Sequence, residues 1–243
     1  KIVYLAVGGF TLLLITVVLL MGAKNTVTLN GISLFTFVRG NVLLYGLLSI
    51  TALFWLMMPF VLSIHARKPL AFLVNREFLF GASILTLAAL IITLTTFQQV
   101  LPLLLYLILL VIIADSSAYF VGRKLGKRKL APSISPGKTV EGAMGGLVVG
   151  ILFSLGAILY FNSDNIQLFG ERDDSWILYL NFLSLSALVV IVSISGDLFE
   201  SVVKRHAGMK DSGAILPGHG GVLDRIDALT AAAPLFFIGL SFI

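Results

Sequence analysis

The chain has 243 residues, of which 58% are hydrophobic and only 12% are charged, and its mean hydropathy is +1.03. Soluble domains carry about 25% charged residues, so this composition excludes a soluble globular protein and predicts a polytopic membrane protein. The chain has no cysteine, which excludes disulfide bonds. The net charge of +5 could indicate a nucleic-acid partner, but the basic residues lie between apolar segments, where membrane topology accounts for them. We therefore expect no nucleic-acid binding.

Seven segments are apolar over the roughly 20 residues that a helix needs to cross a membrane. They predict an all-α fold, a polytopic helical membrane protein forming a single integral domain over residues 1–243. Residue 1 is Lys, and an apolar run too long for a signal peptide follows at once, so we expect native N-terminal sequence to be missing. Only residues 98–100 separate the third and fourth spans, which predicts a tight helical hairpin. The predicted spans are 2–22, 42–64, 78–97, 101–122, 141–161, 176–199 and 226–243.

The distribution of basic residues predicts the orientation of these spans. With residue 1 in the cytosol, fourteen of the 17 Lys and Arg residues lie on the cytosolic side, as the positive-inside rule requires. Polar chemistry is also divided along the chain. Residues 1–97 carry almost none and are expected to form scaffold or lipid-facing helices. Residues 98–243 are expected to form the catalytic half, with cytosolic loops over 123–140 and 200–225.

Asp115 is the first charged residue expected inside the membrane. It stands about seven residues before the cytosolic end of its span, or roughly 10 Å deep at the helical rise of 1.5 Å per residue. A carboxylate at that depth is costly and usually faces a cavity or a partner. Asp115 is therefore a candidate site residue, with a packing role as the alternative.

The segment Ser135-Pro136-Gly137-Lys138-Thr139 resembles the end of a nucleotide-binding P-loop. The glycine that the Walker motif needs five residues earlier is replaced by Pro132, and we expect no β-strand before the segment, so we reject a P-loop. What remains is an anion-binding helix N-terminus, or an ordinary helix start. The basic run from Arg123 to Lys129 is expected to bind lipid headgroups or to fix topology.

Two pairs of acidic residues follow at a helical spacing of three. Asp197 and Glu200 project from one face near the inner surface, and Asp224 and Asp227 repeat the spacing at the start of the last helix. Acidic residues at a helix start are often simple dipole caps. Two pairs flanking one loop fit metal coordination better, because magnesium takes a few carboxylates and leaves its other positions to water and phosphate.

The stretch from Ser201 to Asp227, which contains the loop between these pairs, holds two lysines, two arginines, two histidines and several glycines. Glycines let backbone N–H groups turn toward an anion, and basic side chains neutralise phosphate charge. Together with the carboxylates, this composition predicts a phosphate and metal site. The alternative is a basic loop that only fixes topology.

This pattern resembles the phosphatidate cytidylyltransferases, the CDP-diacylglycerol synthases. Their signature runs Ser-x-apolar-Lys-Arg, four residues, Lys-Asp-x-small, then apolar-Pro-x-His-Gly-Gly-apolar-x-Asp-Arg-apolar-Asp. Segments ADSSAYFVGRKLGKRKLAPSISPGKTVEG and GDLFES also resemble the family in order, except that Ser117 stands where Gly or Thr is common. The likeness covers about residues 100–243. The signature is filled by Ser201, Val203, Lys204, Arg205, Lys210, Asp211, Gly213, Leu216, Pro217, His219, Gly220, Gly221, Val222, Asp224, Arg225, Ile226 and Asp227.

The resemblance implies an all-helical membrane enzyme, a homodimer, with a cytosol-facing funnel open toward the bilayer. It implies CTP and phosphatidic acid as substrates, CDP-diacylglycerol and pyrophosphate as products, and membrane lipids as surroundings. It also implies a metal centre on Asp197 and Asp224, with Mg²⁺ as cofactor and a second, monovalent ion left open. The compact chain favours a bacterial inner membrane.

On this resemblance we hypothesise a role for each candidate residue. Asp227, Glu200 and Asp115 are further candidates for the metal. Catalysis is assigned to Asp197, Asp224, Lys204, Arg205 and Asp227. Phosphate binding is assigned to Ser135, Lys138, Thr139, Lys210, His219, Gly220, Gly221 and Arg225.

Two other functions are compatible with such a charged membrane site. A CTP-dependent kinase of polyprenol or another lipid alcohol would need a base for the hydroxyl group and would release CDP. A transporter of lipids or anions would need a polar path across the bilayer and, typically, paired broken helices in internal repeats. The sequence shows neither feature of a transporter.

Overall fold

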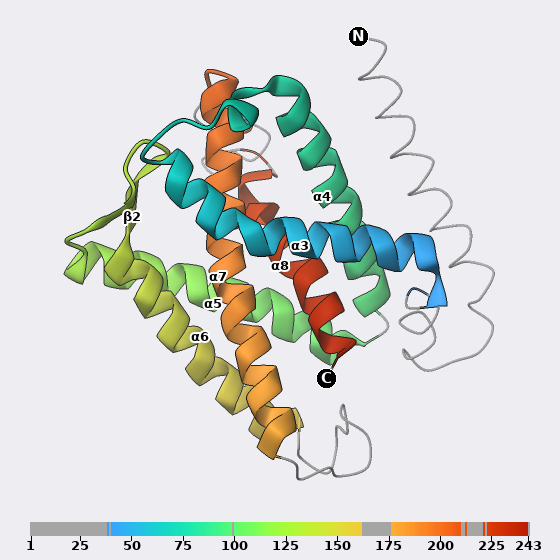
Figure 1. Ribbon diagram of the computed structural model, residues 1–243. Coiled ribbons are helices and arrows are strands. Elements are labelled where there is room, and N and C mark those ends of the chain that lie inside the picture. The colour runs from blue at the N-terminus through green and yellow to red at the C-terminus, as the bar shows by residue number, and fades with distance from the viewer. Residues whose placement is uncertain are drawn as a thin grey trace.

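The computed structural model describes residues 38, 40–98, 100–161, 176–209, 212, 221 and 223–242. Within them the chain is almost entirely helical, which confirms the predicted all-α class (Figure 1). A 3-10 turn, η1 (Ala71–Val74), and a small hairpin are the exceptions. The α-helices are α3 (Val42–His65), α4 (Arg76–Phe97), α5 (Leu101–Leu125), α6 (Val140–Phe161), α7 (Trp176–His206) and α8 (Leu223–Leu240).

Five of these helices, α3 to α7, are long and apolar enough to cross a membrane. They confirm the second to sixth predicted spans and identify an integral membrane protein. The first predicted span, 2–22, lies outside the described residues. Helix α8 covers the seventh predicted span, but it has 18 residues and three charges near its start, and it is not among the five. The predicted number of seven spans therefore stays a prediction.

The helix starts follow from local sequence. Asn41 precedes α3, and its side-chain oxygen accepts hydrogen bonds from the backbone N–H groups of Leu43 and Leu44 at 3.2 Å. Asn75 caps α4 in the same way. Asparagine is favoured at this position because its side chain satisfies backbone donors that the first helical turn leaves free. These caps begin both helices next to polar residues, outside the apolar runs.

The predicted hairpin of the third and fourth spans is wrong. The short connection exists, but α4 and α5 diverge after it, and α5 packs mainly along α6 (Figure 1). Helix α4 turns toward α8 instead, where Phe97 packs against Phe236 and Phe237 with ring centroids 5.6 and 5.9 Å apart. A short connection fixes where two helices meet, but their directions follow from what each packs against, which is α8 for α4 and α6 for α5.

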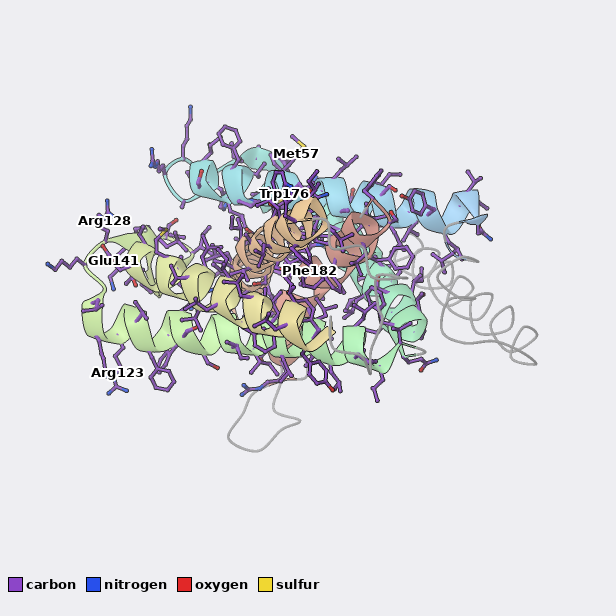
Figure 2. All side chains as sticks on the ribbon, turned by 90° about the horizontal axis from the view of Figure 1, so that it is seen from below. Met57, Arg123, Arg128, Glu141, Trp176 and Phe182 are labelled. Atoms are coloured by element: carbon purple, nitrogen blue, oxygen red, sulfur yellow. The ribbon has the colours of Figure 1, made fainter. Side chains whose placement is uncertain are left out.

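Glycine lets α5 and α6 approach closely. A Cβ atom placed on Gly142 would lie 2.6 Å from the backbone oxygen of Ala118, and one on Gly146 would lie 2.7 Å from that of Ala114. Figure 2 shows Arg123, Arg128 and Glu141 at one end of this helix pair and Phe182 farther along the bundle. The close pairing brings the end of α5 beside the start of α6, where the hairpin lies.

The hairpin corrects the expectation that no strand precedes Gly137-Lys138-Thr139. Strand β1 (Lys129–Ala131) pairs antiparallel with β2 (Ser135–Thr139), so this tripeptide lies on a strand that leads directly into α6. The prediction failed because Lys, Ser, Pro and Gly have low β-propensity. The hairpin is held by burial of Ala131 and Ile134, and by a hydrogen bond from Ser133 Oγ to the backbone oxygen of Ala66 at 3.0 Å. The glycine spacing still argues against a P-loop.

Candidate active site

The first contact of the candidate site joins the hairpin to α7. Lys138 Nζ, on β2, lies 2.7 Å from Asp197 Oδ2, in the third quarter of α7. Both side chains keep part of their surface, with 21% and 29% exposed. Asp115 of α5 is exposed and lies within electrostatic reach of both. Three elements distant in sequence thus bring one lysine and two carboxylates together.

The second contact joins α7 to α8 through a single lysine. Lys204 Nζ lies 2.6 Å from Glu200 Oε2, one helical turn earlier, and 2.6 Å from Asp224 Oδ1 at the start of α8. Glu200 is deeply buried, with 6% of its side chain exposed. Its carboxylate oxygens accept no hydrogen bond of ordinary geometry from any residue that the structure describes, so the close ion pair with Lys204 is its main compensation.

Asp224 also binds Ser212 and Gly221, the two described residues closest before α8. Its Oδ2 atom accepts hydrogen bonds from the backbone N–H of Ser212 at 3.0 Å, from Ser212 Oγ at 2.8 Å and from the backbone N–H of Gly221 at 2.8 Å. Burial alone would raise the pKa of Asp224. The hydrogen bonds from Lys204, Ser212 and Gly221 outweigh burial and hold that pKa well below its usual range. Asp224 is therefore ionised at neutral pH.

Asp227 adds a further carboxylate on the next turn of α8. It interacts electrostatically with Asp197, Glu200 and Lys138, and its Oδ1 atom accepts a hydrogen bond from the Ala228 N–H at 2.7 Å. No described residue forms an ion pair with Asp227 within 4.0 Å. Among the described side chains, the acidic groups of this cluster outnumber its lysines.

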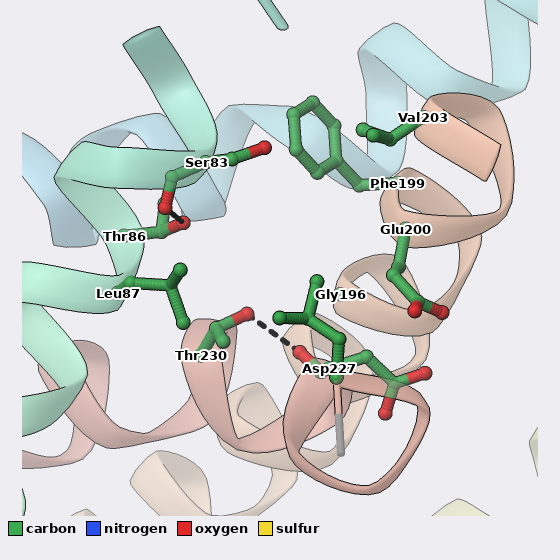
Figure 3. Close-up of a pocket in the computed structure, with 10 residues that line it drawn as sticks. Ser83, Thr86, Leu87, Gly196, Phe199, Glu200, Val203, Asp227 and Thr230 are labelled. Atoms are coloured by element: carbon green, nitrogen blue, oxygen red, sulfur yellow. Dashed lines mark hydrogen bonds between the residues drawn. The ribbon is translucent and has the colours of Figure 1, made fainter. Parts of the chain in front are cut away.

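A small cavity of about 30 Å³ lies beside these acids, between α4, α7 and α8. Figure 3 shows Ser83, Thr86 and Leu87 on one side of the cavity. Glu200 and Asp227 lie on the opposite side. This volume accommodates about one water molecule, so the cavity is not a substrate pocket. It does show that α4 contributes lining residues next to the acidic cluster.

Gly196 allows α7 and α8 to meet at this point. A Cβ atom on Gly196 would lie 2.6 Å from the backbone oxygen of Asp227. We expect Gly196→Ala to push the helices apart, lowering the free energy of unfolding by about 1–3 kcal/mol. Because Asp197 and Asp227 would move apart with them, activity should fall by at least about tenfold. Thermal melting and turnover in detergent would measure both effects.

Gly156 provides the matched control for this variant. It also lies inside a helix, α6, but nothing lies within 4 Å of the position of its Cβ atom. Gly156→Ala should leave stability and activity unchanged or raise stability slightly, since alanine favours helix. Equal behaviour of the two variants would contradict the close approach at Gly196.

The metal centre on Asp197 and Asp224 stays a prediction. Each aspartate contacts a lysine, and the described residues contain no group of three or more His, Asp or Glu side chains arranged to hold a metal ion. The donor chemistry nevertheless fits a hard cation, because all candidates are carboxylates. The excess of acidic groups around Asp227 and Glu200, where Lys204 is the cation described within 4.0 Å of Glu200, also fits a cation.

The remaining predicted residues differ in their relation to this cluster. Thr139 is buried at the start of α6, where its hydroxyl oxygen accepts from the Gly142 N–H at 3.1 Å; it caps the helix. Arg205 is exposed near the end of α7. Ser212 was missed by the sequence analysis, because it is uncharged and stands twelve residues before the aspartate that it contacts. Lys210, His219 and Gly220 lie outside the described residues, while Ser135 and Arg225 are described on β2 and α8.

Five apolar spans, with a cluster of lysines and carboxylates between the hairpin, α5, α7 and α8, define an integral membrane protein of the helical class. The chain belongs to the cytidylyltransferase family, whose family model matches residues 2–243. This confirms the family resemblance found in the sequence. Cytidylyltransferases generally depend on a divalent metal ion.

Several curated relatives carry the name phosphatidate cytidylyltransferase. The protein of Haemophilus influenzae is 51% identical over 134 residues, which are 55% of this chain and 44% of the relative. That of Pseudomonas aeruginosa is 50% identical over 123 residues, 51% of this chain and 41% of the relative. That of Staphylococcus aureus is 45% identical over 134 residues, 55% of this chain and 47% of the relative. The chain thus matches less than half the length of each relative.

Proposed function

We propose that the protein transfers the cytidylyl group of CTP to phosphatidic acid, giving CDP-diacylglycerol and pyrophosphate. A phosphate oxygen of phosphatidic acid attacks the α-phosphorus of CTP. The bond from that phosphorus to the α–β bridging oxygen breaks, and pyrophosphate leaves with the electron pair. The attacking oxygen is already anionic, so no strong base is needed. Family membership supports the cytidylyl group, and the names of the relatives support the lipid acceptor.

The observation that carries this proposal is the joining of Lys138 and Lys204 to carboxylates of three helices at one place. The obstacle to the reaction is electrostatic, because an anionic lipid must approach a polyanionic nucleotide. Preorganised cations offset that repulsion and stabilise charge on the leaving pyrophosphate. We assign Lys138 and Lys204 to phosphate oxygens. In this proposal the phosphate-binding set is completed by Arg205, Lys210, His219, Gly220, Gly221 and Arg225.

Asp197, Asp224 and Asp227 would hold Mg²⁺, with Glu200 and Asp115 as further candidates. Bound there, the ion would neutralise phosphate charge. The site would face the cytosol of a bacterial inner membrane, which the distribution of basic residues and the bacterial relatives support. A homodimer and a second, monovalent ion are supported only by the family resemblance.

Pyrophosphate release by the purified protein tests the proposal. Release should require phosphatidic acid, CTP and Mg²⁺ together, and it should fall by about a hundredfold or more in Asp224→Asn, which loses charge opposite Lys204. Diacylglycerol and a polyprenol would be offered in parallel as alternative acceptors. Release of CDP with a lipid alcohol, and no pyrophosphate with phosphatidic acid, would contradict cytidylyl transfer and identify a lipid kinase.

A further inference from the structure

Asp197 is the most accessible of the carboxylates that form an ion pair in the cluster. Asp224 already receives four donor groups, from Lys204, from the N–H and hydroxyl of Ser212, and from the N–H of Gly221. Glu200 is buried against Lys204. Asp197 keeps 29% of its side chain exposed, and the contact described for its carboxylate is the single ammonium group of Lys138. An incoming cation can therefore reach Asp197 by displacing one partly exposed contact.

Lys138 can leave Asp197 without disturbing the fold. Its backbone is fixed in the hairpin, where Lys129 pairs with Thr139 and the Val140 N–H donates to the Arg128 oxygen at 2.9 Å. Only the flexible side chain reaches α7. Ion pairs that are partly exposed to water are weak, so this one is readily exchanged.

The charges around Asp197 favour such an exchange. Asp227 and Asp115 both interact with Asp197 electrostatically, and neither forms an ion pair with a described residue. A divalent cation placed between Asp197 and Asp227 would supply two positive charges where Lys138 supplies one. Carboxylate oxygens are among the ligands that hard divalent cations such as Mg²⁺ prefer.

We propose that Lys138 and a divalent cation compete for Asp197, so that cation binding releases the Lys138 ammonium toward the phosphate groups of the substrate. Lys138 then acts as a built-in counter-ion that keeps Asp197 paired until the cation arrives. The destination of the released ammonium rests on the proposed function. The competition itself does not, because it involves only this chain and the cation.

Binding of Mn²⁺ alone, followed by the electron paramagnetic resonance signal of the free ion, tests the competition. Lys138→Met removes the competing ammonium and should tighten Mn²⁺ binding by about three- to tenfold, as expected for losing one adjacent charge at a partly exposed site. Lys129→Met removes a charge from the same hairpin at an exposed position, and should change the Kd by less than about twofold. Asp197→Asn should abolish tight binding.

An unchanged or weaker affinity in Lys138→Met would overturn the proposal, as would the absence of Mn²⁺ binding to the wild type. The unaltered protein offers a second test that needs no variant. Acylation of lysine amines, quantified by mass spectrometry, should accelerate severalfold at Lys138 when Mg²⁺ is added, and should stay constant at Lys129. Parallel behaviour of the two lysines would also overturn it. Neither test uses CTP or lipid, so a failure here would leave the cytidylyl-transfer reaction itself to be decided by pyrophosphate release.

Discussion

Lys204→Met should lower both stability and activity, with the largest stability loss expected for any single change in the cluster. Methionine keeps most of the side-chain volume but leaves the buried Glu200 carboxylate without its counter-ion. Removing one partner of a buried ion pair costs about 3–5 kcal/mol, because the other charge stays uncompensated. Activity should fall by at least about a hundredfold, since Lys204 is also assigned to phosphate. Thermal melting in detergent and pyrophosphate release would measure the two losses.

A double variant separates these two roles of Lys204. Glu200→Gln removes the buried charge that Lys204 compensates, so Glu200→Gln with Lys204→Met should recover much of the lost stability while remaining inactive. If the double variant melts no higher than Lys204→Met alone, the stability role assigned to the pair is wrong. If it regains activity, the phosphate role of Lys204 is wrong.

Asp197→Asn should show the opposite pattern, with a large loss of activity and little loss of stability. The ion pair with Lys138 is partly exposed and contributes at most about 1 kcal/mol. The carboxylate is assigned to the metal, whose stabilisation of transition-state charge amounts to several kcal/mol, so turnover should fall by about a hundredfold or more. Pyrophosphate release and melting temperature would be measured on the same preparations.

Glu77→Gln is the matched control for Asp197→Asn. Glu77 is an exposed carboxylate in the first turn of α4, outside the cluster. Replacing it with Gln removes one negative charge and keeps the side-chain shape, as Asp197→Asn does. Its activity should equal that of the wild type. An Asp197→Asn protein that keeps wild-type turnover would remove Asp197 from the metal centre and from the catalytic assignment together.

The membrane helices could be predicted because their signal is local. Runs such as Leu101 to Ala114 are apolar over most of a span, and the predicted bounds from the second to the fifth span agree closely with α3 to α6. Helix α7 begins where the sixth span was predicted but continues to His206. The divergence of α4 and α5 could not be predicted, since it depends on the packing of α4 against α8 and of α5 against α6, which follow later in the chain. The hairpin was missed because its strands carry polar residues of low β-propensity.

The residue types of the candidate site could be predicted from the sequence, but not which lysine pairs with which carboxylate. Carboxylates inside or beside a span are costly enough to mark Asp115, Asp197 and Glu200 from the sequence alone. Their partners depend on packing between elements, so the joining of Lys138 to Asp197 required the structure. Ser212 carries no charge and was overlooked, yet it supplies two of the donors that hold Asp224.

The fate of the CTP phosphates tests the central claim most directly. The purified protein would be given phosphatidic acid, Mg²⁺ and CTP labelled with ³²P at either the α- or the γ-phosphate, and the lipid would be extracted into organic solvent. Cytidylyl transfer predicts that the α-label enters the lipid fraction and the γ-label stays in water as pyrophosphate. Recovery of the γ-label in lipid, with the α-label left in water as CDP, would contradict the proposed reaction.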